Sequence, residues 1–427
     1  MTASVSETDE NGSKRSSGAF FGWRIVGIGF IANFLAGAIT LATFGNFVDP
    51  VAATFEVPRS TVGLGMSIAF LVMGLLGPFA GAALDRGWAR VMMATGALVA
   101  GSGLILLSRA TTLTQAAVLF CGVVGIGAAL FGIMPSMALT ANWFIKKRGL
   151  AIGIAVAGAT IASYVAPATA QSLIDAYGWR TAVLCFGVAT IAIGVPVFGG
   201  LVIGRPEEVG QVPDGPSQHE DAGSGSPTDG RVLELSQLIR DPRLWLLAVG
   251  FGMVLTSPVV LSPMVVPFGR DLGFTGQQAN VFFLAMVPFS LLGKVVIGRL
   301  ADVAPMKPAI GLVVVANILV WGLFYVEPSY GLFVVTGAIF GIGIGGAMPL
   351  QGVALGRCFG RENFGRASGL GGLVAIPVIA AASAVSQLLQ GATGSFHASF
   401  LVQIGLLAFG GGLLAIVRIP ASEGAPD

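Results

Sequence analysis

GAALD at residues 81–85 closes one long apolar run of the sequence, and GRLAD at residues 298–302 closes another, 217 positions later. Other features recur at nearly the same interval. Arg148 and Arg366 each open an apolar run, 218 positions apart, and Met-Pro pairs stand at 134–135 and 348–349. Small residues follow both arginines at four-residue spacing: Gly149, Gly153 and Ala157 in the first half, and Ala367, Gly371 and Ala375 in the second. These repeats predict two copies of one structural unit.

The composition excludes most classes of soluble protein. Of 427 residues, 54% are hydrophobic and 10% are charged, whereas ordinary soluble domains have about 45–50% apolar and about 25% charged residues. The mean hydropathy of +0.85 is typical of a membrane protein with many spans. A net charge of +2 argues against a nucleic-acid-binding protein.

No metal site, cofactor site or catalytic centre is expected. The three cysteines, Cys121, Cys185 and Cys358, form no Cys-x-x-Cys pair and lie in or beside apolar runs, so we interpret them as small core residues. The two histidines, His219 and His397, cannot build a metal centre alone. The sequence also lacks the HExxH, GxSxG and Walker motifs, which argues against an enzyme and against an ATP-driven pump.

Twelve runs are long enough to cross a membrane, since a helix needs about 20 apolar residues to span roughly 30 Å of hydrocarbon. They are residues 23–48, 61–83, 91–109, 113–140, 149–175, 180–204, 243–269, 276–300, 306–326, 329–355, 366–390 and 397–418. Together with the repeats, they predict an all-α membrane protein with twelve transmembrane helices in two pseudo-symmetric six-helix bundles. Small residues at fixed spacing allow close approach of helices in lipid, and we expect the two halves to slide on such faces.

The predicted domain boundaries follow from changes in composition. A polar segment rich in proline, glycine and serine covers residues 205–242 and is predicted to be a flexible linker. The two bundles cover residues 23–204 and 243–418. We expect a disordered N-terminal tail over residues 1–22 and a short C-terminal tail over residues 419–427.

The positions of Lys and Arg predict the orientation. With the N-terminus inside, 18 of the 23 cations fall in cytoplasmic segments and 4 in outer segments, as the positive-inside rule requires. Both tails and the linker are therefore expected in the cytoplasm. The expected location is the plasma membrane, or the inner membrane of a Gram-negative cell. The remaining cation, Lys294, lies inside the eighth run.

The loop that follows the second run has the pattern Gly-xxx-Asp-Arg-xxx-Arg at residues 81–90. It resembles the signature of the major facilitator superfamily, and the whole chain is similar to that family, whose members have two repeated halves. Trp88 and Ala89 depart from the family pattern, and in the second copy Val303 replaces the first cation. The resemblance implies the fold of that superfamily and a gating role for this loop.

Short segments resemble one branch of that superfamily, the monocarboxylate porters and oxalate/formate antiporters. They are FGWRIV at 21–26, KRGLA-x-G at 147–153, GWR-x-A at 178–182, NFGR at 363–366 and TGSF at 393–396. The resemblance implies a secondary active transporter of small organic anions. The implied partners are a monocarboxylate or dicarboxylate, a co-transported proton or an exchanged anion, and the lipid bilayer. A monomeric transport unit is expected.

Lys294 is the residue that we expect to bind the substrate. It is the one group in the interior of the twelve runs, away from their ends, that is charged at neutral pH, and a lysine at the bilayer centre costs at least about 2.5–3.5 kcal/mol. Ser290 and Gly298 share its helix face, and no acidic residue stands nearby in sequence. In the resembled branch an essential arginine occupies this place. The alternative is a lysine whose side chain reaches the cytoplasmic interface near Arg299.

Other polar residues within the runs are weaker candidates for substrate contact: Asn33, Tyr164, Gln351 and His397. Part of the resembled branch has an embedded lysine and an aspartate where Asn46 and Ser290 stand here, so its proton-coupling scheme is not expected. For the gate, we expect Asp85, Arg86 and Arg90 to form charge-assisted contacts at cytoplasmic helix ends when the protein faces outward. Asp302 is the counterpart in the second half.

Two other functions remain as alternatives. The first is an exporter of an uncharged or cationic small molecule, although an embedded acid would favour a cation and none is present. The second is a transporter-like membrane sensor or scaffold. The short tails and the linker have no room for a signalling domain, which argues against it.

Overall fold

The computed structural model describes residues 20–214 and 233–420, and this part of the chain is helical and contains no strand. Residues 1–19, 215–232 and 421–427 lie outside the described residues, and with them most of both predicted tails and the middle of the predicted linker. The N-terminal half contains α1 (Gly22–Gly37), η1 (Ala38–Ala42), α2 (Thr43–Phe55), α3 (Arg59–Asp85), α4 (Ala89–Leu107), α5 (Leu113–Ala117), η2 (Val118–Val124), α6 (Gly125–Phe131), α7 (Ile133–Trp143) and α8 (Arg148–Leu201).

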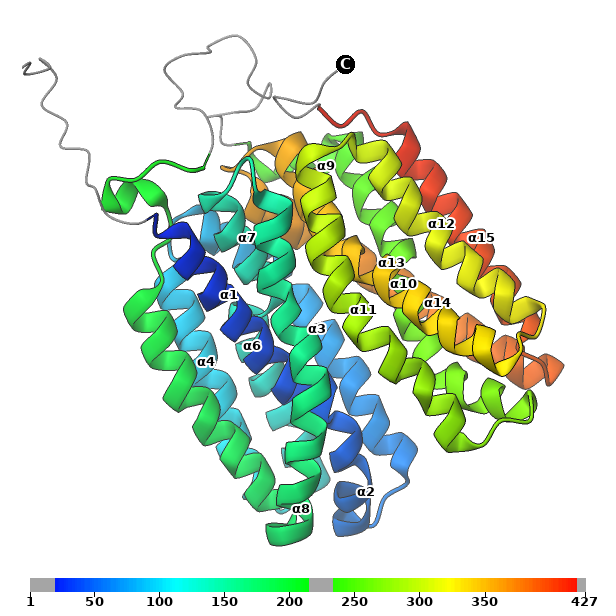
Figure 1. The fold of residues 1–427 in the computed structure, drawn as a ribbon. Helices are drawn as coiled ribbons and strands as arrows, with labels where there is room; N and C mark the ends of the chain where they lie inside the picture. Colours follow the sequence, from blue (N-terminus) through cyan, green and yellow to red (C-terminus); the bar gives the residue numbers. More distant parts are fainter. Residues whose placement is uncertain (1–19, 215–232, 421–427) are drawn as a thin grey trace, which may run out of the picture.

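The described ends of the predicted linker carry two short helices, η3 (Pro206–Val209) and α9 (Leu235–Arg240). The C-terminal half contains α10 (Pro242–Asp271), α11 (Gly276–Val303), α12 (Met306–Tyr325), α13 (Tyr330–Phe359), α14 (Phe364–Thr393) and α15 (His397–Ile416). Figure 1 shows α9 at one end of the molecule, together with the start of α1 and the end of α15. We call this end the linker face and the opposite end the distal face.

Eleven helical segments of the described residues are long and apolar enough to cross a membrane. One of them, α8, has 54 residues, and at 1.5 Å per residue it would extend about 80 Å, far more than the roughly 30 Å of a bilayer core. Gly178 divides α8 into two helices, because its φ of 79° and ψ of 162° are not helical. The predicted twelve-span fold is therefore confirmed.

Two spans contain π-helical turns. The first span runs without a break through α1, η1 and α2, and the fourth runs through α5, η2, α6 and α7. A π turn takes up an extra residue without ending the helix. The first span therefore continues across the membrane with a locally widened backbone. The fourth span continues through η2 in the same way and is interrupted farther on at Gly132, whose ψ of −144° is not helical.

Glycines bring the two halves into close contact near the linker face. On α11, a Cβ added at Gly298 would lie 2.5 Å from the carbonyl oxygen of Gly149 on α8. On α3, a Cβ added at Gly77 would lie 2.9 Å from the carbonyl oxygen of Gly369 on α14. Since real Cβ atoms do not approach so closely, these contacts require glycine. These contacts are equivalent in the two halves, α8 with α11 and α3 with α14. The predicted small-residue face of α8 forms the first, since Gly149 and Gly153 lie against α11. The predicted face of α14 does not form the second, because Gly371 and Ala375 lie on the other side of that helix, against Ala248 and Gly252 of α10.

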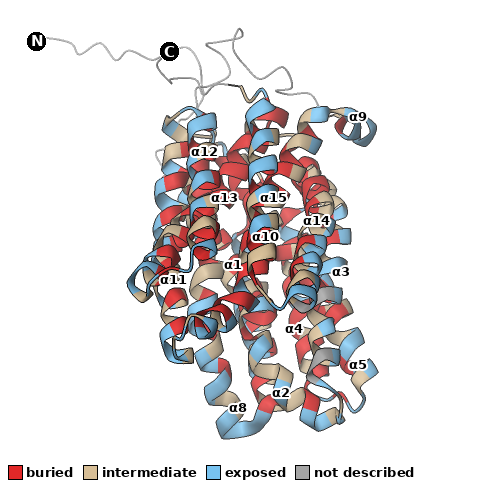
Figure 2. Cartoon of the chain, turned by 90° about the vertical axis from the view of Figure 1, so that its right-hand side faces the viewer, coloured by how far each residue is buried: buried red, intermediate tan, exposed pale blue. Residues whose placement is uncertain are grey.

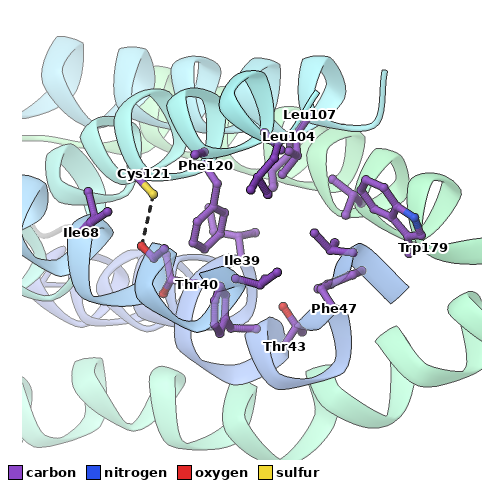
Figure 3. Close-up of a pocket in the computed structure, with 18 of the residues that line it drawn as sticks. Ile39, Thr40, Thr43, Phe47, Ile68, Leu104, Leu107, Phe120, Cys121 and Trp179 are labelled. Atoms are coloured by element: carbon purple, nitrogen blue, oxygen red, sulfur yellow. Dashed lines mark hydrogen bonds between the residues drawn. The ribbon is translucent and has the colours of Figure 1, made fainter. Parts of the chain in front are cut away.

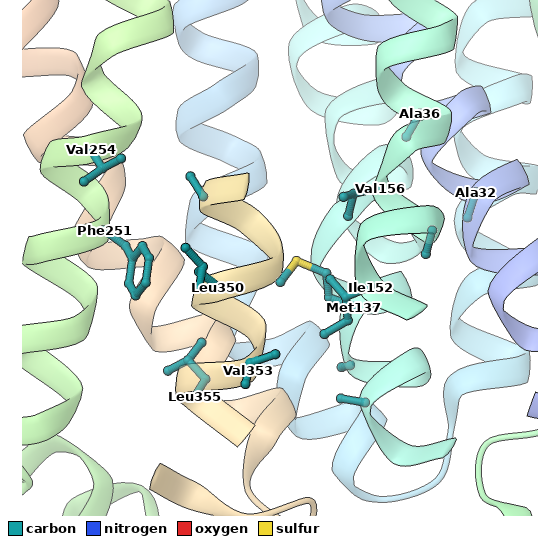
Figure 4. Close-up of a cluster of buried hydrophobic side chains, with 14 of the residues drawn as sticks. Ala32, Ala36, Met137, Ile152, Val156, Phe251, Val254, Leu350, Val353 and Leu355 are labelled. Atoms are coloured by element: carbon teal, nitrogen blue, oxygen red, sulfur yellow. The ribbon is translucent and has the colours of Figure 1, made fainter. Parts of the chain in front are cut away.

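Apolar side chains continue this contact toward the middle of the molecule. Figure 4 shows Ile152 and Met137 of the N-terminal half pointing toward α13, which carries Leu350 and Val353. All four side chains are buried.

Figure 2 shows that the exposed residues lie mainly on the outward faces of the helices. Many of these are large and apolar, such as Phe79 with 73% of its surface exposed, as expected for a lipid-facing surface.

The span count and the side of the linker can be tested with single cysteines in a variant whose three native cysteines are replaced by serine. Trp88, Tyr177 and Val209 are all exposed. If α8 crosses the membrane twice, a membrane-impermeant maleimide labels Tyr177→Cys from one side and both Trp88→Cys and Val209→Cys from the other. Labelling of all three positions from the same side would contradict the twelve-span topology.

Candidate functional site

The N-terminus of α8 is bound by an aspartate of the other half. The backbone amide of Gly149 donates a hydrogen bond of 2.6 Å to Oδ1 of Asp302, and the amide of Leu150 donates one of 3.0 Å to Oδ2. The first amides of a helix have no partner within the helix, and the helix dipole favours a negative charge there. Asp302, at the end of α11, therefore fastens the two halves at the linker face.

Asp85 makes the equivalent contact in the other repeat. Its Oδ1 and Oδ2 accept hydrogen bonds of 3.0 Å from the amides of Gly365 and Arg366 at the start of α14. The guanidinium of Arg366 adds an ion pair, with Nε 3.4 Å from Asp85 Oδ2. Both aspartates of the Gly-xxx-Asp segments thus bind a helix N-terminus across the contact between the halves.

The two arginines expected in the gate do not reach the other half. Arg86 is exposed, with no described partner. Arg90 donates a hydrogen bond of 2.5 Å from Nε to the carbonyl oxygen of Gly199, within the N-terminal half. Of the loop residues named from the sequence, only Asp85 joins the halves in this structure.

Residues at the start of the predicted linker add contacts that the sequence pattern did not indicate. Arg205 pairs with Glu362 at 3.1 Å, and Glu207 pairs with Arg361 at 2.7 Å. Arg205 also donates a hydrogen bond of 2.9 Å to the carbonyl oxygen of Asp85. The hydrogen bonds and ion pairs that join the described parts of the two halves therefore lie at the linker face.

Asp214, the last described residue before the undescribed part of the linker, binds the loop that leads into α8. Its carboxylate accepts hydrogen bonds from the amides of Ile145, Lys146 and Lys147, of 2.6, 3.2 and 3.2 Å. The start of α8 is thus bound by two carboxylates. Asp302 comes from the opposite half, whereas Asp214 follows the last helix of the same half and so remains when the halves separate.

Lys294 lies on α11, one turn from Ser290 toward the linker face. Its Nζ is 3.3 Å from Ser290 Oγ. The backbone of this turn packs directly on α8, because a Cβ added at Gly153 would strike the Lys294 carbonyl oxygen. Helical side chains point toward the helix N-terminus, which for α11 is the distal face. The ammonium therefore points away from Arg299 and the linker face, opposite to the direction that the interfacial alternative requires.

No carboxylate neutralises this lysine in the described part of the chain. Lys294 takes part in no ion pair within residues 20–214 and 233–420. Ser290 is 95% buried, and its backbone is in close contact with Gly341 and Gly345 of α13. A hydroxyl and an unpaired cation consequently stand together on α11, where the two halves meet.

Exposure increases along α8 from this point toward the distal face. Gly153 is buried and Ala157 is 8% exposed, whereas Tyr164 is 59% exposed. Tyr164 stands eleven residues after Gly153, close to three full turns, so both positions are on one helix face. The face of α8 that packs against Lys294 is thus exposed three turns farther toward the distal face.

The other candidates from the sequence are not brought to Lys294 by any described contact. Asn33 is fully buried within the N-terminal half, where its amide donates hydrogen bonds to Ser136 Oγ and to the Gly29 carbonyl oxygen. Gln351 is buried on α13, without a described hydrogen bond. His397 lies at the distal face, 3.6 Å from Glu327. The described residues contain no cluster of three metal-binding side chains.

The family model described as Major Facilitator Superfamily matches residues 26–326, and these include both Gly-xxx-Asp segments. The chain belongs to the Major Facilitator Superfamily. The resemblance inferred from the sequence motifs is therefore confirmed, and the protein is a membrane transporter and not an enzyme.

Relatives of this superfamily transporter point to the same branch. Monocarboxylate transporter 13 of Bos taurus is 28% identical over 406 residues, which cover 92% of this chain and 88% of the relative. Monocarboxylate transporter 2 of Rattus norvegicus is 26% identical, covering 93% and 83%. The agnestins efflux protein of Paecilomyces divaricatus is 25% identical, covering 88% and 85%.

A solved structure confirms the fold. The human organic anion transporter MFSD10 (TETRAN) superposes with a TM-score of 0.66 at 15% sequence identity, covering 92% of this chain and 99% of that one. At this identity the similarity concerns the fold alone. The arrangement of two related halves is therefore shared, and the substrate is a separate question.

The two aspartates lead to a direct prediction. Asp85→Asn and Asp302→Asn should each shift the population toward a state open at the linker face by about 10- to 100-fold. A hydrogen bond to a charged group contributes about 1.5–3 kcal/mol, and 1.4 kcal/mol corresponds to tenfold. Spin labels at the exposed positions Trp88 and Lys307, one in each half, would report this shift as a larger population with the longer distance between the labels.

The matched control is Asp271→Asn, which removes an exposed carboxylate at the distal end of α10. It should leave the distance distribution unchanged. If Asp85→Asn and Asp302→Asn also left it unchanged, the two carboxylates would be ordinary helix caps without a part in gating.

Proposed function

We propose that this transporter carries small organic anions, monocarboxylates or dicarboxylates, by alternating access as a secondary active transporter. The observation that carries the proposal is Lys294, whose unpaired ammonium lies beside Ser290 Oγ where the two halves meet. A cation inside a membrane-spanning helix needs a compensating negative charge. A substrate carboxylate supplies that charge, and it can accept hydrogen bonds from both Nζ and the serine hydroxyl.

The position of Lys294 also supports the mechanism. It packs on the α8 face that becomes exposed farther toward the distal side, and the linker face beyond it is closed by Asp85 and Asp302. A substrate that enters from the distal face would meet the cation before it meets the closed contact. If the linker face is cytoplasmic, as the distribution of Lys and Arg predicts, the structure represents an outward-facing state.

Lysine and arginine differ in how they hold a carboxylate. An arginine binds both oxygens with a planar fork, whereas a lysine is a compact donor on a flexible stem. We infer that Lys294 tolerates several carboxylate geometries and that Ser290 contributes to their orientation. The names of the monocarboxylate transporter relatives agree with this substrate class.

The second candidate function is export of an uncharged small molecule. It is favoured by the similarity to the agnestins efflux protein. A substrate without negative charge would leave Lys294 uncompensated, so the two functions predict opposite effects when the lysine is removed.

Lys294→Ala should weaken binding and uptake of the preferred carboxylate by about 10- to 100-fold, because a hydrogen bond to a charged group contributes about 1.5–3 kcal/mol. Lys294→Arg should restore part of the activity, since the charge returns. Lys294→Glu should abolish anion transport by repulsion. The measurement is uptake of labelled monocarboxylates and dicarboxylates into proteoliposomes, with and without a pH gradient.

Lys307→Ala is the matched control, since it removes an exposed lysine near the start of α12. It should transport as the unmodified protein does. Uptake by Lys294→Ala at the unmodified rate and affinity would refute carboxylate binding by this residue, and improved uptake of an uncharged compound would support the efflux function instead.

A further inference from the structure

A cavity lies within the N-terminal half, apart from the contact between the halves. Its volume is about 290 Å³, and all of its lining residues come from the first, second, third, fourth and sixth spans. It extends from the distal ends of these spans, near Leu113 and Trp179, to the middle of the membrane, near Ile39 and Ile68. Figure 3 shows side chains converging on this space from several helices.

The walls offer a ligand almost nothing polar. Phe44, Phe47 and Phe120 are among the lining side chains. The hydroxyls of Thr40 and Thr43 point into their own helix, since they donate to the carbonyl oxygens of Ala36 and Ala38 at 2.7 and 2.8 Å. A charged or strongly polar ligand would lose its hydration here without compensation. The cavity therefore suits a hydrocarbon group and not a carboxylate.

The two π-helical turns form part of this space. Ile39 and Thr40 of η1 line one side, and Phe120 and Cys121 of η2 line another. Figure 3 shows Cys121 at one edge, where its Sγ lies 3.2 Å from the carbonyl oxygen of Gly65 on α3. Because π turns occur often at functional sites, their placement on both sides of one cavity is an independent reason to consider it a binding site.

The mouth of the cavity is on the lipid-facing surface. Leu64 and Ile68 of α3 line the cavity and are also 62% and 49% exposed, and Ala117 at the end of α5 is likewise exposed. From Thr61 to Ile68, the α3 wall runs about 10 Å at 1.5 Å per residue. This is a large part of one leaflet's hydrocarbon depth, roughly 15 Å. An acyl chain that hangs from the distal membrane surface runs in the same direction.

We propose that this cavity binds one acyl chain of a lipid of the surrounding leaflet, which enters between α3 and the fourth span. The volume of about 290 Å³ is close to the lower end of ligand-site volumes, about 300 Å³, and well above the about 150 Å³ of an apolar cavity that binds benzene. The acyl chain would fill the space beside η1 and η2 and pack against the distal half of the first span. The site is distinct from Lys294, and it does not depend on the proposed substrate class.

The test is photo-crosslinking of the full-length protein in vesicles that contain a phospholipid with a photoreactive group in its acyl chain. The proposal predicts adducts on interior lining residues, in peptides that contain Ile39 to Phe47 and Ala116 to Cys121. Adducts confined to outward-facing residues such as Phe79 would overturn it.

Two variants narrow the cavity from different walls. Ala117→Phe narrows the mouth, and Gly65→Leu fills the interior, where an added Cβ would meet only Cys121 Sγ at 3.7 Å. Each should lower the interior adducts about tenfold, which corresponds to about 1.4 kcal/mol, while adducts on Phe79 stay constant and report a folded protein. Val118→Phe is the matched control, since Val118 is exposed next to the mouth without lining the cavity. Unchanged interior adducts in both cavity variants would contradict the proposal.

A third arm distinguishes a bilayer lipid from a hydrophobic solute. A water-soluble photoreactive decane derivative is added to the detergent-solubilised protein and to vesicles. Interior labelling by the phospholipid probe in vesicles supports a lipid site. Interior labelling by the soluble probe alone would overturn the lipid assignment in favour of a site for apolar solutes.

Discussion

The structure depends on the backbone amides at the starts of α8 and α14. Such amides have no partner within their own helix, and leaving them unbonded away from water is costly. Here each pair is bound by a carboxylate from the opposite half, Asp302 for α8 and Asp85 for α14. The halves can separate at the linker face only if water or another acceptor replaces these carboxylates. Closure is therefore a stable arrangement that can still be reversed.

Glycine makes this capping possible. The carboxylates reach the helix starts only because α8 and α11, and likewise α3 and α14, approach to backbone contact at Gly149, Gly298, Gly77 and Gly369. The same contact determines where Lys294 lies, since its carbonyl oxygen packs on Gly153 while its side chain extends toward the distal face. The closed contact and the unpaired cation are thus neighbours on α11. A movement that opens one will change the surroundings of the other.

Much of this could be predicted from the sequence. Apolar run lengths and the repeat interval predicted twelve spans, and the two Gly-xxx-Asp segments predicted Asp85 and Asp302 as equivalent residues. The partners of these aspartates are backbone amides, and every residue type except proline carries one, so the sequence does not indicate which residues they bind. Arg205 and Glu362 pair across 157 positions, so no spacing rule connects them. The π turns of η1 and η2, and the cavity beside them, arise from packing and have no sequence signal that we recognise. The direction of Lys294 follows from helix geometry alone.

The central claim is that the two halves rock about the contact that contains Lys294. It is tested most directly by measuring one distance at each face of the same protein in lipid nanodiscs, with spin labels at Trp88 and Lys307 for the linker face and at Tyr177 and Val326 for the distal face. All four positions are exposed. The account predicts two populations at each face, with opposite responses to a transported carboxylate, so that one distance lengthens as the other shortens. A single fixed distance at both faces, or two distances that change in the same direction, would contradict it.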